Sequence, residues 1–153
     1  MSTQISRASL DDTDALLALM HDFYAESGFA LDRVVHETAF AHLLSTPPLG
    51  GVWIARQGGV PAGHVVLAVR FTMEHAGLSG YVDDLYVRPE FRRMGIGRLL
   101  LDAVVRDCRT RGCRSLHVEV AGDNQAALAL YAAFGLQPAT DGRVLASGPL
   151  EGD

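Results

Sequence analysis

The sequence predicts a single α/β domain spanning residues 1–153, in which strands and helices alternate along the chain. Its length is enough for one domain with a sizeable core. A content of 48% hydrophobic and 20% charged residues is typical of a soluble globular protein. The spacing of the apolar residues predicts the order strand, helix, helix, three strands, helix, strand, helix, strand.

The first third of the chain is predicted to hold one strand and two helices. Residues 5–8 form the strand, and Ser9 or Asp11 then caps a helix that ends at Gly28. A second helix covers residues 32–44 and is stopped by two prolines. The residues expected to face inward are Leu16, Leu17, Leu19, Met20, Phe23 and Tyr24 in the first helix, and Val35, Ala39, Phe40, Leu43 and Leu44 in the second.

The remaining elements begin with strands at residues 51–56, 60–72 and 80–87, the first two joined by a glycine turn. A helix at 97–111 follows. Next come a strand at 114–120, a helix at 124–134 closed by Gly135, and a last strand at 143–146. The face of the 97–111 helix expected to be buried carries Ile96, Leu99, Leu100, Ala103 and Val104.

A glycine-bearing turn, Arg92-x-x-Gly95-x-Gly97, joins the 80–87 strand to the following helix. Glycines let the backbone turn closely onto a helix N-terminus, whose free N–H groups and dipole bind phosphate. The turn is not a P-loop, because no lysine follows the glycines, and it lacks the third glycine of a dinucleotide fingerprint. An ordinary strand-to-helix turn is the alternative interpretation.

Two segments in this half of the chain resemble the GNAT superfamily of acetyl-CoA-dependent N-acetyltransferases. Leu85-Tyr86-Val87 followed by the glycine turn is similar to the family's [QR]-x-x-G-x-[GA] signature and the strand before it. Residues 124–136, NQAALALYAAFGL, are similar to its N-x-x-A-x-x-[FL]-Y-x-x-x-G-F pattern, with Leu136 in place of phenylalanine. The resemblance is strong from Gly80 to Pro138, and it implies a central mixed, mostly antiparallel sheet with helices on both faces.

The same resemblance implies acetyl-CoA as the cofactor. Main-chain amides of the glycine turn are expected to hold its pyrophosphate, and the strand before the turn, splayed from its neighbour at a bulge, pairs with the pantetheine arm. Arg92 or Arg93 is a further candidate for a side-chain contact to phosphate. The expected cofactor-binding residues are Leu85, Tyr86, Val87, Arg92, Arg93, Met94, Gly95, Ile96, Gly97, Arg98, Asn124 and Tyr131.

Tyr131 is the candidate general acid implied by the resemblance. It stands two helical turns after Asn124, so both can face one cleft. A phenol with a pKa near 10 suits protonation of a thiolate of similar basicity. A packed core tyrosine remains the alternative for Tyr131, and a simple helix cap remains the alternative for Asn124.

Asp83 and Asp84 are adjacent in a strand that otherwise reads as buried, and such carboxylates are costly there unless they face a polar cleft. Strand alternation predicts opposite faces for the two, unless a bulge resets it. The strand resembles the polyamine- and thialysine-acetylating branch, which implies that Asp83 is the base, acting on the amine through water. Simple attraction of the amine is the alternative. Asp83, Asp84 and Glu119 are the expected acceptor-binding residues.

Charge is distributed unevenly along the chain, whose net charge is −5, and this balance argues against general nucleic-acid binding. Residues 88–114 carry eight arginines against three carboxylates, a local balance of +5 that suits an anionic cofactor. The acidic remainder suits a cationic amine. The chain has no lysine, and its two cysteines read as reduced structural thiols rather than metal ligands.

The sequence thus predicts an N-acetyltransferase that acts by direct attack of a small cationic amine on acetyl-CoA. A peptide or protein amine as acceptor, and a non-catalytic acyl-CoA-binding module, are the alternatives. No apolar run approaches the roughly 20 residues that span a bilayer, and no signal-peptide pattern opens the chain. We therefore expect a cytoplasmic protein with no membrane or nucleic-acid partner and no metal. The family resemblance further implies a homodimer.

Overall fold

The computed structural model describes residues 2–150, whose strands form one five-stranded sheet in the order β1-β2-β3-β4-β5. Every neighbouring pair is antiparallel except β4 and β5, which are parallel. This mixed, mostly antiparallel sheet confirms the predicted fold class. The elements are β1 (Thr3–Arg7), α1 (Thr13–Glu26), α2 (Arg33–Leu44), β2 (Gly50–Gln57), β3 (Val60–Thr72), β4 (Gly77–Val87), α3 (Ile96–Arg111), β5 (Ser115–Val118) and α4 (Gln125–Ala133).

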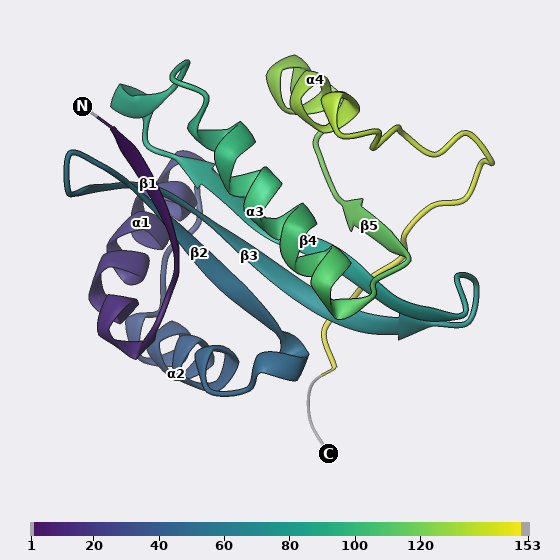
Figure 1. The fold of residues 1–153 in the computed structure, drawn as a ribbon, viewed down its shortest axis with the longest axis horizontal. Coiled ribbons are helices and arrows are strands. Elements are labelled where there is room, and N and C mark those ends of the chain that lie inside the picture. The colour runs from purple at the N-terminus through teal and green to yellow at the C-terminus, as the bar shows by residue number, and fades with distance from the viewer. Residues whose placement is uncertain (1, 151–153) are drawn as a thin grey trace.

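Helices cover both faces of the sheet, with α1 and α2 on one face and α3 and α4 on the other (Figure 1). Each face has its own apolar core. Leu16, Leu17 and Leu19 of α1 are fully buried on one side, and Leu100 and Leu101 of α3 are fully buried on the other. Each such side chain contributes roughly 1.5–3 kcal/mol by leaving water, so the sheet is held rigid between the two layers.

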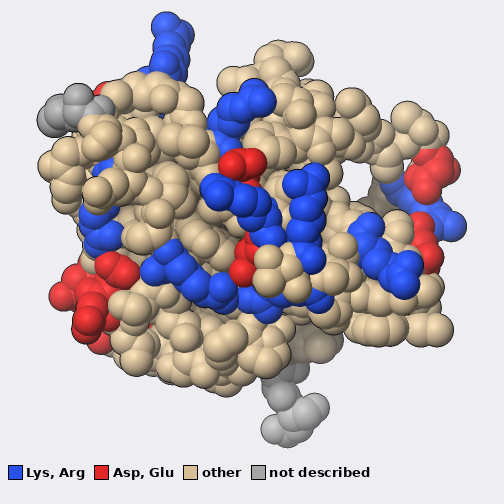
Figure 2. Space-filling view, viewed as in Figure 1, with Lys and Arg blue, Asp and Glu red and all other residues tan. Residues whose placement is uncertain are grey.

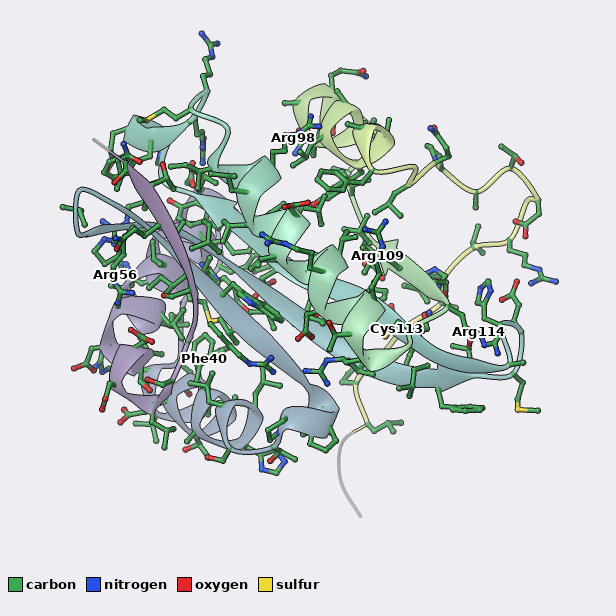
Figure 3. All side chains as sticks on the ribbon, viewed as in Figure 1. Phe40, Arg56, Arg98, Arg109, Cys113 and Arg114 are labelled. Carbon is green, nitrogen blue, oxygen red and sulfur yellow. The ribbon has the colours of Figure 1, made fainter. Side chains whose placement is uncertain are left out.

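The predicted inward faces of two helices need correction. Val35 and Ala39 of α2 are exposed, because α2 contacts α1 and β2 along one narrow side that buries only Phe40 fully (Figure 3). In α3, Leu99 is 40% exposed whereas Leu101 is fully buried. The buried face of α3 therefore includes Leu101, and not Leu99, beside Leu100.

The prediction of a last strand at residues 143–146 is wrong. From Gln137 to Leu150 the chain has no helix or strand, and its side chains are exposed. A β-prone segment becomes a strand only when a neighbouring strand accepts its hydrogen bonds, and none pairs with it in the described residues. Within residues 2–150, no helix is both long enough and apolar enough to cross a membrane.

Candidate active site

The centre of the sheet carries a bulge in β4. Val66 of β3 pairs with Asp84 and Leu67 pairs with Val82, so Asp83 is an extra residue with no partner of its own. Pairing between β4 and β5 ends close by, at Val82 and Val118. Beyond this point the edge of β4 from Asp83 to Val87 is not paired with β5, as the resemblance predicted.

The bulge resets the alternation of side chains along β4. Val82 packs in the core under α3, whereas Tyr86, four residues later, packs in the core under α1. Without a bulge, both would lie on the same face. Asp84 consequently lies on the α1 side, where its charge acts on Tyr24 and where His36 acts on it.

A cleft of about 1520 Å³ opens where β4 and β5 part. Asp83, Asp84 and Glu119, the three predicted acceptor-binding residues, all line it. We call its two sides the α4 wall and the α1 wall. The α4 wall consists of Asn124, Ala127, Leu128, Leu130, Tyr131 and Gly135, and the α1 wall of Phe23, Ser27 and Phe29.

The glycine turn ends in the N-terminus of α3. The first backbone hydrogen bond of this helix joins Leu99 N–H to the Gly95 carbonyl at 3.1 Å, so the N–H groups of Ile96, Gly97 and Arg98 have no acceptor within the helix. Gly95 has φ 77° and Arg93 has φ 65°, both left-handed. Such a concave run of N–H groups at a helix N-terminus fits a pyrophosphate.

The side chain of Arg92, a predicted cofactor-binding residue, forms hydrogen bonds to protein groups. Its Nη2 donates to both carboxylate oxygens of Glu26, at 2.9 and 3.0 Å, and its Nε donates to the Val87 carbonyl at 2.9 Å. Its guanidinium also lies over the Tyr86 ring, 5.9 Å from the centroid. The Arg92 side chain therefore ties the turn to the end of α1.

Two other arginines, Arg93 and Arg98, lie at the turn and the start of α3, and neither forms an ion pair with a carboxylate among residues 2–150. Arg98 extends from the first turn of α3 toward α4, its guanidinium 5.7 Å from the Phe134 ring centroid (Figure 3). Basic side chains line this face of the molecule (Figure 2). Further along α3, Arg106 and Arg111 pair with Asp102 and Asp107.

On β4, the predicted cofactor-binding side chains differ in access. Leu85 and Val87 pack partly against the core under α3, and Leu85 lines the cleft. Tyr86 is 4% exposed and stacks on Phe23, with ring centroids 5.2 Å apart. Tyr86 can therefore meet a cofactor only through its backbone. Around the turn, Met94 is exposed and Ile96 is buried.

Tyr131 and Asn124 both come to the cleft from α4. The Asn124 side chain caps the helix, accepting a hydrogen bond from Ala127 N–H at 3.1 Å. Tyr131 is 7% exposed, and burial raises the pKa of its phenol. A buried tyrosine that lines a cleft keeps its proton at neutral pH, so it can act as a general acid there.

The acidic residues of the cleft have perturbed pKa values. Burial, and then the charge of Asp83, raise the pKa of Asp84 to about 6. Desolvation by the cleft, and then the charge of Glu119, also raise the pKa of Asp83. Glu119 in turn accepts a hydrogen bond from the Tyr81 hydroxyl. A carboxyl with a pKa near neutrality is suited to take a proton from an ammonium group.

The α1 wall is the part of the site that the sequence did not reveal. Phe23 was assigned to the core, and Ser27 and Phe29 were not singled out. Nothing in their spacing could mark them, because they reach the cleft only through the packing of α1 on the sheet. Glu26, the partner of Arg92, was missed for the same reason.

Two further findings concern histidines and metals. His64, on β3, is fully buried between apolar neighbours and neither ring nitrogen has a hydrogen-bond partner among the described residues. Burial lowers the pKa of His64 to about 4, so its ring is neutral. Within residues 2–150, no three His, Cys, Asp or Glu side chains are placed to hold a metal ion.

Comparison with known proteins gives the family. Residues 14–136 match the Acetyltransferase (GNAT) family. A [ribosomal protein bS18]-alanine N-acetyltransferase of Salmonella typhimurium is 42% identical over 57 residues, 37% of this chain and 38% of that protein. A thialysine N-epsilon-acetyltransferase of Bos taurus is 37% identical over 65 residues, 42% of this chain and 38% of that protein. These matches thus span well under half of each relative.

Solved structures match over nearly the whole chain. An integron cassette protein from the mobile metagenome of Cole Harbour salt marsh has a TM-score of 0.87 and 36% identity, covering 98% of this chain and 92% of that one. A predicted acetyltransferase from Clostridium acetobutylicum, solved with acetyl-CoA, has a TM-score of 0.78 and 19% identity, covering 95% and 96%. At 19% identity the second likeness concerns the fold.

Proposed function

Because the chain belongs to the acetyltransferase (GNAT) family, we propose that it transfers the acetyl group of acetyl-CoA to a primary amine, with a small cationic amine as the acceptor. The observation that carries the proposal is the cleft at the β4 bulge. Asp83 and Asp84 line it at the bulge, Tyr131 lines it from α4, and the glycine turn lies beyond the end of β4.

When bound, acetyl-CoA supplies the acetyl thioester. The N–H groups of Ile96, Gly97 and Arg98 would hold its pyrophosphate, and the unpaired edge of β4 after Asp83 would contact its pantetheine arm. The amine nitrogen forms a bond to the acetyl carbon while the carbon–sulfur bond breaks. The amine then loses one proton and the thiolate gains one, and the Tyr131 hydroxyl holds a proton for that thiolate.

The amine must be neutral to attack, so the cleft needs a base. Asp83 was the base that the sequence and the resemblance implied, and it lies in the bulge. Asp84 has the better-matched acidity, because its pKa of about 6 leaves it ionised at pH 7 but still able to accept a proton. We therefore assign proton acceptance to the Asp83–Asp84 pair, directly or through water.

A peptide N-terminal amine is the second candidate acceptor. One relative is named for acetylating an alanine of a ribosomal protein and another for acetylating thialysine, a small amino acid. The acidic cleft accommodates either kind of ammonium group. Homodimeric assembly and a cytoplasmic location stay predictions from the sequence.

The test is release of CoA thiol from acetyl-CoA in the presence of alkyl and aryl monoamines, diamines, amino acids and alanine-terminated peptides. We expect at least one class to raise the rate well above hydrolysis without amine. If all classes fail while acetyl-CoA still binds in a direct titration, the chain is an acyl-CoA-binding module and the proposal is wrong.

A further inference from the structure

The α1 wall is the part of the cleft that would contact the acceptor beyond its amino group. We propose that the acceptor is a monoamine whose amino group is attached to an aromatic or similarly flat apolar body, rather than a polyamine. This inference rests on the proposed acetyl transfer and specifies its substrate class. It is carried by the charge, ring contacts and exposure of the residues on the acceptor side of the cleft.

Asp22 and Glu26, at the C-terminal end of α1, are paired with arginines from the β4–α3 connection. Arg92 pairs with Glu26 through two hydrogen bonds, and Arg88 lies 3.6 Å from Asp22. The α1 wall therefore presents no free negative charge to a second ammonium group. A polyamine would place its second ammonium group along this wall, where no carboxylate would offset the cost of removing that group from water.

The wall is aromatic instead. Phe23 is stacked on Tyr86 at 5.2 Å, and Tyr24 makes edge contacts with Phe29 at 6.5 Å and His36 at 5.5 Å. Phe29 lines the cleft and is 69% exposed. An exposed ring beside half-buried rings offers a surface on which a flat apolar group can stack, and such contacts contribute about 0.5–1.5 kcal/mol beyond burial.

The negative charge is confined to one end of the acceptor side. Asp83 and Asp84 are adjacent at the bulge, and Glu119, which raises the pKa of Asp83, is hydrogen-bonded by the Tyr81 hydroxyl. His36 acts on Asp84, and Arg143 also lines the cleft. We place the ammonium group of the acceptor among these carboxylates, so that the rest of the acceptor meets Phe23 and Phe29.

The experiment compares catalytic efficiency, kcat/KM, for four amines: 2-phenylethylamine, hexylamine, 1,5-diaminopentane and spermidine. We expect 2-phenylethylamine to exceed both polyamines by at least about tenfold, the ratio that corresponds to 1.4 kcal/mol. Hexylamine should fall between them, since it is apolar but not flat. If the polyamines are preferred, the inference is overturned while the proposed acetyl transfer stands.

Two variants test the role of Phe29. Phe29→Ala should raise KM for 2-phenylethylamine about tenfold and change KM for hexylamine less. Phe71→Ala is the matched control, because Phe71 is 64% exposed on β3 and does not line the cleft. Equal effects of the two variants on 2-phenylethylamine would overturn the inference. Activity with none of the four amines would overturn the inference, and the wider panel of amino acids and peptides would then test acetyl transfer itself.

Discussion

The two walls of the cleft are built in different ways. The α4 wall comes from one contiguous segment, in which Asn124 caps the helix and Tyr131 follows two turns later. The α1 wall is held in place by pairs between distant residues, such as Arg92 and Glu26, which are 66 positions apart. The wall that supplies the proposed general acid is thus locally encoded, and the wall assigned to acceptor choice depends on tertiary packing.

The largest expected effect concerns the α4 wall. Tyr131→Phe keeps the packing but removes the hydroxyl, so kcat should fall by about 10²- to 10⁴-fold, as for loss of a general acid. KM for acetyl-CoA should stay within about twofold, because the hydroxyl is not assigned to binding. Steady-state kinetics with varied acetyl-CoA measures both. A kcat within twofold of the wild type would identify Tyr131 as a packed core residue.

Asp83 and Asp84 should set the pH dependence of kcat/KM. With a pKa of about 6, Asp84 is ionised above pH 6 and loses its basic form as the pH falls below it. We expect kcat/KM to decline below pH 6, and Asp84→Asn to lower kcat/KM about 10²-fold and abolish that decline. Asp83→Asn is the matched comparison. If only the Asp83 variant alters the profile, Asp83 alone is the base.

The α1 side of the sheet should also be the acid-sensitive side. The pKa of His64 is about 4 in the folded protein against an ordinary 6.5. Below pH 6.5 the unfolded chain therefore binds a proton on His64 that the folded chain does not, and this difference favours unfolding. This contribution to stability is full above pH 6.5, declines as the pH falls toward 4, and amounts to about 3 kcal/mol.

His64→Leu should remove that part of the acid sensitivity. Denaturant unfolding of the wild type and the variant at pH 7 and pH 4.5 measures it. His42→Leu, which changes an exposed histidine of α2, is the control and should follow the wild type. A variant that stays as acid-sensitive as the wild type would show that His64 is not the group responsible.

The two glycines of the turn should behave differently. Gly95 has φ 77°, so Gly95→Ala should cost about 1–2 kcal/mol of strain and weaken acetyl-CoA binding about tenfold. A Cβ at Gly97 would lie 3.4 Å from Leu130 Cδ2, an ordinary contact, so Gly97→Ala should leave stability nearly unchanged. Denaturant unfolding and acetyl-CoA titration distinguish the two. Equal losses of stability would contradict the left-handed turn.

The smallest effect is expected for the ion pair that joins the glycine turn to α1. Glu26→Gln removes a partly exposed ion pair, so the free energy of unfolding should fall by about 1 kcal/mol or less, with the difference shrinking in high salt. Asp102→Asn, which breaks a more exposed pair with Arg106, should cost less. If Glu26→Gln also changes the ratio of kcat/KM for aryl amines to diamines, the pair is shown to shape the acceptor side.

The sequence by itself determined the elements and the motifs whose geometry is local. The glycine turn, the capped α4 with Tyr131 and the order of the nine main elements depend on backbone φ, helix caps and apolar periodicity within short windows. For that reason these features, and the mixed sheet that the family resemblance implied, could be predicted without coordinates.

The tertiary structure alone decided what depends on partners distant in the chain. The position of the bulge set the face of Asp84, the pairing with Glu26 holds the Arg92 side chain against α1, and α1 packing brought Phe29 to the cleft. Residues 143–146 have strand-forming composition but no strand to pair with. In each case the outcome depends on a contact between residues that are distant in the sequence, and no short window of sequence contains both partners.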